Sequence, residues 1–212
     1  MPSFDAIALD VDGTLLDSTE ISVQILYQTL RAAGLDITMP QLDFAHHATD
    51  IQVWNHFGIG HRERELLPIM RRISQPLQSQ QKPFPGVMEM LRALKDSGLT
   101  LAMVSNRTDA QFTEDSALDD MLAMMDFWVS CETVGIGKPD PAPLHYFLEK
   151  AGCPPERALM VGDSPSDSLA AKAAGIPFAL ALWGALDKDI PADYHLEQPA
   201  DLLSLLNLQA QP

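Results

Sequence analysis

Short apolar segments alternate with amphipathic segments along most of the chain. Helical spacing of apolar residues is present at 87–94, 144–151 and 166–174, and a glycine follows soon after each segment. The apolar segments are nearly continuous, as is typical of strands covered on both faces. These predicted strands are Ala6–Asp12, Leu99–Asn106, Met125–Glu132, Arg157–Asp163 and Pro177–Trp183. The alternation predicts an α/β fold with a doubly wound parallel sheet.

The alternation is interrupted between the first two predicted strands. Residues 17–82 carry helical patterns and no convincing strand pattern, and a linker-like stretch, residues 74–86, returns the chain to the sheet. A small all-helical insert therefore follows the first strand. The expected division is a core of residues 1–16 with 83–212 and an insert of residues 17–82.

Polar residues gather at the predicted carboxyl ends of four strands. Asp10 and Asp12 follow the first strand, Ser105 and Asn106 the second, Lys138 the third, and Asp163 and Asp167 the fourth. The carboxyl ends of parallel strands share one edge of the sheet, and ligands bind at that edge in open α/β folds. Carboxylates, a hydroxyl and an ammonium group brought there together predict a functional site.

Two simpler interpretations of these motifs fail. In the segment DVDGT, Gly13 is too early and Ile21 stands where a calcium-binding EF-hand needs glutamate. The segment GIGKP is not a phosphate-binding P-loop, because Glu132 stands at the place of its first glycine and Pro139 replaces its Ser or Thr. A tight hairpin at Asp12–Gly13 is disfavoured, since a helical pattern rather than a partner strand follows.

The motifs DVDGT, SN, KPDP and GDSPSD resemble, in the same order, the four motifs of the haloacid dehalogenase superfamily. The resemblance covers nearly the whole chain, and residues 137–177 are similar to the phosphoglycolate phosphatase-like branch. It implies a Rossmann-like core with the helical cap that subfamily I carries after its first strand. It also implies hydrolysis through an aspartyl-phosphate intermediate.

The resemblance assigns different roles to the carboxylates. Asp10 is the implied nucleophile, and Asp12 the general acid–base that protonates the leaving oxygen and later activates water. The implied cofactor is Mg²⁺, held by the Asp10 carboxylate, the Asp12 backbone carbonyl and Asp163. Asp167 completes the predicted metal site by orienting a metal-bound water.

The remaining motif residues are expected to contact the substrate phosphate. Ser105 and the backbone N–H of Asn106 hold phosphate oxygens in the implied site, and Lys138 neutralises charge. Gly13 lets the chain turn sharply beside the substrate. Arg107 directly follows the second motif, where similar phosphatases often carry a basic residue, and a phosphate contact at the rim of the site is expected.

Several reactions occur within this superfamily, and the sequence excludes some of them. Asp12 and the GDSPSD motif argue against a dehalogenase, which lacks both features. No lysine lies between residues 17 and 81, which argues against a phosphonatase with a cap lysine. The expected function is a Mg²⁺-dependent phosphatase for a small phosphorylated metabolite, of phosphoglycolate type or a sugar phosphate. A phosphomutase of the β-phosphoglucomutase type and a catalytically silent binding protein remain as alternatives.

Composition limits the partners. The net charge of −15 among 212 residues argues against a nucleic-acid partner. Cys131 and Cys153 form no disulfide framework, which favours a reducing cytoplasm. No apolar stretch is long enough to span a membrane and no signal peptide is recognisable, so no membrane partner is expected. A monomer is favoured.

Overall fold

The structure is a computed structural model that describes residues 4–47, 50–78 and 80–208. The chain divides into two compact units, Met1–Asp17 with Pro83–Pro212 and Ser18–Lys82. This boundary differs by one residue from the expected division, which placed Asp17 in the insert. The two chain ends of the expected core, and residue 79 of the linker-like stretch, lie outside the described residues.

The first unit is built on a six-stranded parallel sheet with strand order β5-β4-β1-β6-β7-β8. Its strands are β1 (Ala6–Leu9), β4 (Thr100–Val104), β5 (Phe127–Val129), β6 (Ala158–Gly162), β7 (Phe178–Ala181) and β8 (Tyr194–Leu196). The predicted parallel α/β sheet is confirmed. The strand β8 was not predicted, because its three residues lie between polar residues and not within a longer apolar run.

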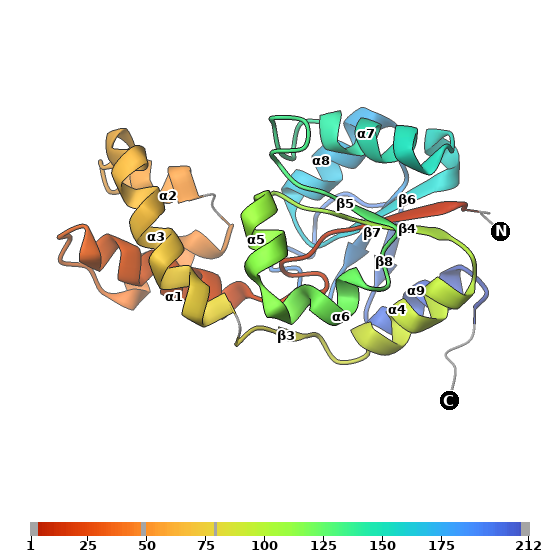
Figure 1. Cartoon of the computed structure of the whole chain (residues 1–212), viewed down its shortest axis with the longest axis horizontal. Helices are drawn as coiled ribbons and strands as arrows, with labels where there is room; N and C mark the ends of the chain where they lie inside the picture. The colour runs from red at the N-terminus through yellow and green to blue at the C-terminus, as the bar shows by residue number, and fades with distance from the viewer. Residues whose placement is uncertain (1–3, 48–49, 79, 209–212) are drawn as a thin grey trace. The chain divides into compact units, whose positions relative to one another are not determined.

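Helices cover both faces of this sheet (Figure 1). The helices and 3-10 turns of this unit are α4 (Val87–Asp96), α5 (Asp109–Glu114), η3 (Ser116–Leu118), α6 (Asp119–Leu122), α7 (Ala142–Ala151), η4 (Pro155–Arg157), α8 (Pro165–Ala174) and α9 (Pro199–Leu205). Ile7 and Leu9 of β1 pack in the hydrophobic cluster that includes α4 and α9. Ala6 and Ala8 pack in the cluster that includes α7 and α8. Because alternate residues are buried on opposite faces, the strands read as continuous apolar runs.

The second unit is helical and has a hydrophobic core of its own, which includes Leu26, Leu30, Trp54 and Leu66. It contains α1 (Thr19–Ala32), η1 (Met39–His47), α2 (Asp50–His56), η2 (Gly60–Arg62) and α3 (Glu63–Gln78). The helix α1 packs against α3 and η1. Among the described residues, no helix combines the length and the apolar character that crossing a membrane requires.

A small two-stranded sheet lies where the chain passes between the units. It pairs β2 (Leu16–Asp17) with β3 (Lys82–Pro83). The expectation that residues 17–82 contain no strand is therefore wrong at both ends of the insert. Strands of two residues show no periodicity, so the sequence pattern cannot reveal them.

Candidate active site

The predicted site residues of the core lie at the carboxyl edge of the sheet. Asp10 follows β1, Ser105 follows β4, Asp163 follows β6, and Asp167 lies in the first turn of α8. Lys138 reaches the same place from the loop between β5 and α7. The topology thus brings together motifs that are more than a hundred residues apart in the sequence.

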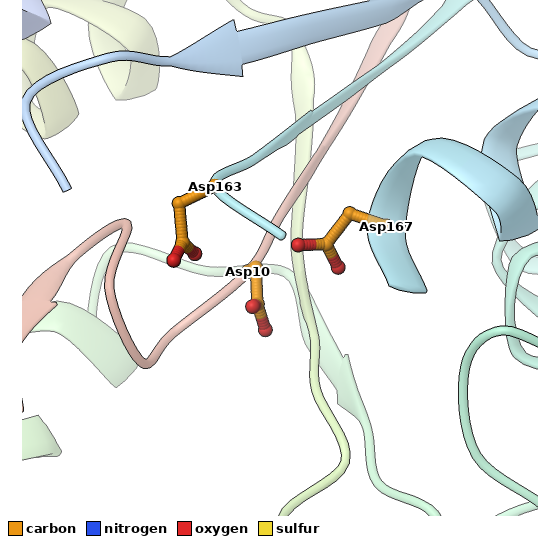
Figure 2. Close-up of side chains that lie close together, drawn as sticks. All are labelled: Asp10, Asp163 and Asp167. Carbon is orange, nitrogen blue, oxygen red and sulfur yellow. The ribbon is translucent and has the colours of Figure 1, made fainter. Parts of the chain in front are cut away.

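Three carboxylates form a cluster. Asp10, Asp163 and Asp167 each offer an oxygen within 4.8 Å of the others, and Figure 2 shows the three side chains gathered at one point. Asp10 and Asp167 are buried, and Asp163 is half-buried. Like charges this close repel one another, and burial weakens their hydration, so the cluster needs positive charge for compensation.

Lys138 supplies part of this compensation. Its Nζ lies 2.8 Å from Asp10 Oδ1 and 2.5 Å from Asp167 Oδ1, and its side chain is buried. Although burial lowers it, the pKa of Lys138 is raised overall by the carboxylates of Asp10 and Asp167. Lys138 is therefore a charged member of the site.

The start of α8 fixes the orientation of Asp167. Ser164 is the N-cap residue, with Pro165 at the first helical position. Asp167 Oδ2 accepts hydrogen bonds from Ser164 Oγ at 2.6 Å and from Ser164 N at 3.1 Å. This capping box leaves Oδ1 directed at Lys138, so the cap of the helix also positions a site residue.

The pKa values of Asp10 and Asp163 are raised, because burial disfavours their charged forms and Lys138 compensates only part of the cluster's negative charge. Burial and the nearby Asp167 carboxylate raise the pKa of Asp10 to about 7, against the opposing effect of Lys138. Burial, Asp167 and Asp10 likewise raise the pKa of Asp163. Three carboxylates face one ammonium group, and all the cluster's acceptors are oxygens. This donor set fits a hard divalent cation such as Mg²⁺.

The loop after β1 is locked against Asp163. Thr14 Oγ1 donates a hydrogen bond to Asp163 Oδ1 at 2.9 Å. Gly13 has a φ of +78°, and a Cβ at this position would lie 2.1 Å from Asp163 Oδ2. Glycine is required here for two reasons: the backbone is left-handed, and the Asp163 side chain leaves no room for a Cβ. Sequence reasoning gave no role to Thr14, although it belongs to the quoted DVDGT motif.

Residues after β7 also hold this loop, and they were not predicted as part of the site. Trp183 Nε1 donates a hydrogen bond to the backbone oxygen of Thr14 at 2.9 Å. A Cβ on Gly184 would lie only 1.7 Å from the backbone oxygen of Gly13. The only signal in the sequence is a Trp-Gly pair at the end of a predicted strand, which does not identify its contact.

We predict that Gly184→Ala lowers the free energy of unfolding by about 1–3 kcal/mol, because the new methyl group overlaps a backbone atom that cannot rotate away. Urea denaturation measures this change. Gly60→Ala is the matched control, since its close neighbour is the Oδ1 atom of the Asn55 side chain, which can rotate. Equal stability of both variants and the wild type would contradict the contact.

Ser105 and Asn106 form the second motif, at the carboxyl end of β4. Ser105 is buried, and its Oγ accepts a hydrogen bond from Arg107 N at 3.3 Å. Asn106 is exposed, and its Nδ2 donates a hydrogen bond to the backbone oxygen of Lys138 at 2.9 Å. This bond ties the second motif to the third. Phosphate binding by Ser105 and Asn106 stays a prediction.

Asp12 and Arg107 form an ion pair beside the carboxylate cluster. Arg107 Nε and Nη2 donate to Asp12 Oδ2 at 2.7 Å and Oδ1 at 2.8 Å. Arg107 Nη1 donates to Asp115 Oδ2 at 2.7 Å. Arg107 is buried, so the expectation of a rim position is wrong. A buried guanidinium needs carboxylate partners, and Asp115 was not singled out in the sequence.

The charge cluster predicts how stability without a metal depends on pH. Between the ordinary aspartate pKa and the raised pKa of Asp10, the folded chain binds more protons than the unfolded chain, so stability falls as pH rises. Asp163→Asn removes one clustered charge. We expect this variant to melt several degrees above the wild type at pH 8 in EDTA, with a smaller difference at pH 5.

Thermal unfolding at both pH values, with and without Mg²⁺, measures this effect. At pH 8 the cation should stabilise the wild type more than Asp163→Asn. An Asp163→Asn variant that melts below the wild type in EDTA at pH 8 would show that charge repulsion does not dominate the cluster.

Comparison with known proteins finds a matching family model, named relatives and similar solved structures. The model of the haloacid dehalogenase-like hydrolase family matches residues 7–181. A phosphoglycolate phosphatase from Aquifex aeolicus is 34% identical over 95% of this chain and 96% of its own. A solved structure of a candidate phosphoglycolate phosphatase from Lactobacillus plantarum is 26% identical, with a TM-score of 0.88 over 96% of this chain and 99% of that chain.

A candidate β-phosphoglucomutase from Thermotoga maritima shares the fold. Its structure is 22% identical to this chain, with a TM-score of 0.77 over 96% of this chain and 99% of that chain. At this identity the likeness concerns the fold alone.

Proposed function

Because the chain belongs to the haloacid dehalogenase-like hydrolases, we propose that it is a Mg²⁺-dependent enzyme that hydrolyses the phosphomonoester of a small metabolite. Family membership and the named phosphatases among its relatives make it a phosphatase. The observation that carries the finer proposal is the cluster of Asp10, Asp163 and Asp167 around Lys138, with Asp12 beside it.

The proposed reaction has two steps. In the first, Asp10 attacks the phosphorus, an aspartyl-phosphate forms, and the ester oxygen leaves with a proton from Asp12. In the second, Asp12 takes a proton from water, the water oxygen attacks phosphorus, and the Asp10 carboxylate and inorganic phosphate are released. In this reaction Asp10 forms and then loses a covalent bond to phosphorus, while Asp12 only transfers protons.

The other residues bring substrate and nucleophile together. Ser105, the Asn106 backbone N–H and Lys138 would bind phosphate oxygens and stabilise the charge of the transition state. Asp10, Asp163 and the Asp12 backbone carbonyl would hold Mg²⁺, and Asp167 would orient a water beside it. The positive charge supplied there would reduce the repulsion between carboxylate and phosphate. In this proposal, the 18–82 unit is a cap that selects the substrate and limits the access of water.

We place a phosphoglycolate-type substrate ahead of a sugar phosphate. The Aquifex relative, which carries the name phosphoglycolate phosphatase, aligns over nearly the whole chain, insert included. A phosphomutase remains the second candidate because it requires the same nucleophile and acid–base pair. Cytoplasmic location and a monomeric state are part of the proposal and rest on the sequence alone.

A survey of substrates tests the function. The purified protein with Mg²⁺ is assayed for phosphate release from phosphoglycolate and a series of sugar phosphates, and Asp10→Asn purified in parallel controls for contaminating phosphatases. The proposal predicts the highest kcat/KM for phosphoglycolate. Isomerisation of a hexose phosphate that depends on a bisphosphate would establish the mutase instead. Tight binding without turnover across the series would contradict both enzymatic proposals.

A further inference from the structure

Arg107 lies behind Asp12, away from the surface. Its side chain is 4% exposed, whereas the side chain of Asp12 is 38% exposed. The guanidinium therefore belongs to the interior, and the carboxylate that it holds is accessible from outside. A side chain in this place can orient Asp12 without standing between Asp12 and a substrate.

The hydrogen bonds fix both oxygens of Asp12. Nε and Nη2 of Arg107 donate in parallel to the two carboxylate oxygens, which is the bidentate geometry that a planar guanidinium favours. A single bond would let the carboxylate rotate about it, but two parallel bonds define its plane. A lysine ammonium at the same position would keep the charge and lose this planar constraint.

Asp115 holds Arg107 from the other side. Its side chain is fully buried, and its Oδ2 accepts from Arg107 Nη1. Its Oδ1 accepts from the backbone N–H of Ala117 at 3.1 Å, so Asp115 is itself fixed by the start of η3. The chain of contacts runs from a helical turn through Asp115 and Arg107 to Asp12.

This geometry differs from that of a phosphate-binding arginine. Three of the five N–H groups of Arg107 already donate to the two carboxylates. A phosphate dianion would have to reach a buried guanidinium that two carboxylates already hold, and Arg107 offers little exposed surface for such a contact. Although burial opposes it, the carboxylates of Asp12 and Asp115 raise the pKa of Arg107, which keeps the side chain charged.

We propose that Arg107 is a positioning residue that orients the Asp12 carboxylate for proton transfer, and that Asp115 orients Arg107. The inference rests on the proposed phosphatase function, in which Asp12 transfers protons. Misplacing an acid–base group by a small distance lowers the rate of proton transfer but leaves the phosphate contacts in place. The expected signature is a loss of kcat without a change in KM.

The test compares Arg107→Lys with Arg157→Lys, an exposed arginine paired with Asp5, as the matched control. Two substrates are used: phosphoglycolate, or the best alkyl phosphate of the survey, and p-nitrophenyl phosphate, whose leaving group departs as a stable phenolate without a proton. We expect Arg107→Lys to lower kcat for the alkyl phosphate by about 10- to 100-fold, with KM within about twofold.

With p-nitrophenyl phosphate, rapid-mixing measurements separate the two steps. The first release of nitrophenolate by Arg107→Lys should slow by less than about threefold, and a burst should precede a slow steady state, because only the second step needs Asp12. The Asp115→Asn variant should change kcat in the same direction by a smaller factor. In the double variant, the losses should combine to less than the product of the single losses.

Two outcomes for Arg107→Lys would overturn this assignment. A rise in KM with unchanged kcat would make Arg107 a substrate ligand. Equal losses in the burst and in alkyl phosphate turnover, together with a lower melting temperature, would make its role merely structural. If Arg107→Lys does not fold, Asp115→Asn must still slow the alkyl phosphate more than the burst. A wild-type protein that turns over no phosphomonoester would instead overturn the proposed function, and with it the role of Asp12.

Discussion

Replacing Asp10 with asparagine is expected to lower phosphomonoester hydrolysis by at least about 10³-fold, because the nucleophile of the first step is lost. An amide keeps the size of the side chain but cannot form the aspartyl-phosphate. The variant should fold, since it removes one of three clustered carboxylates whose repulsion and burial raise the pKa of Asp10 to about 7. Steady-state assays with Mg²⁺, alongside thermal unfolding, measure both effects.

Asp189→Asn provides the matched control for this change. Asp189 is exposed, in the loop after β7, and lies outside the cluster. The activity of the Asp189→Asn variant should equal that of the wild type. If Asp10→Asn folds and retains more than about a tenth of the wild-type activity, Asp10 is not the nucleophile.

Removing divalent cations with EDTA is the second change with a large expected effect. Three carboxylates face a single ammonium group, so an incoming phosphate dianion meets net negative charge. A bound cation contributes several kcal/mol to such reactions, and its loss should lower kcat/KM by about 10³-fold. Added Mg²⁺ should restore the activity of the wild type.

Asp163→Asn distinguishes loss of a bound cation from a general effect of the chelator. Its activity should be low before EDTA is added, and it should need a higher Mg²⁺ concentration than the wild type for whatever activity it regains. Full wild-type activity in EDTA, after dialysis against chelator, would exclude a cation from the reaction.

The sequence predicts the centre of this site better than its surroundings. Asp10, Asp163 and Lys138 could be placed together because one rule of topology puts the carboxyl ends of parallel strands at one edge. That rule needs only the order of strands and helices. It does not depend on the conformation of any side chain.

No comparable rule predicts from the sequence which way the Arg107 side chain points. It depends on Asp115, which lies in a short irregular stretch between α5 and η3, where no periodicity marks a buried position. The capping box formed by Thr108 and Gln111 could have located α5 from its spacing. Which carboxylate a nearby arginine selects is decided by tertiary packing.

Close backbone contacts are similarly invisible in a sequence. The approach of Gly184 to Gly13 joins the end of β7 to the loop after β1, across a sheet whose strand order must first be known. The strands β2 and β3 were missed because two residues display no period, and β8 was missed because its three residues lie among polar ones. Strand existence was predictable for the longer runs, and boundaries were not.

The central claim is that Asp10 forms a covalent phosphoenzyme and that Asp12 is needed to resolve it. The most direct test uses Asp12→Asn with p-nitrophenyl phosphate, since this substrate needs no proton for its leaving group and the variant cannot activate water. Borohydride reduction of the quenched reaction converts an aspartyl-phosphate to homoserine, and peptide mass spectrometry locates it. We expect homoserine at position 10, with one equivalent of nitrophenolate released. Modification at another residue, or a burst without modification at position 10, would contradict it.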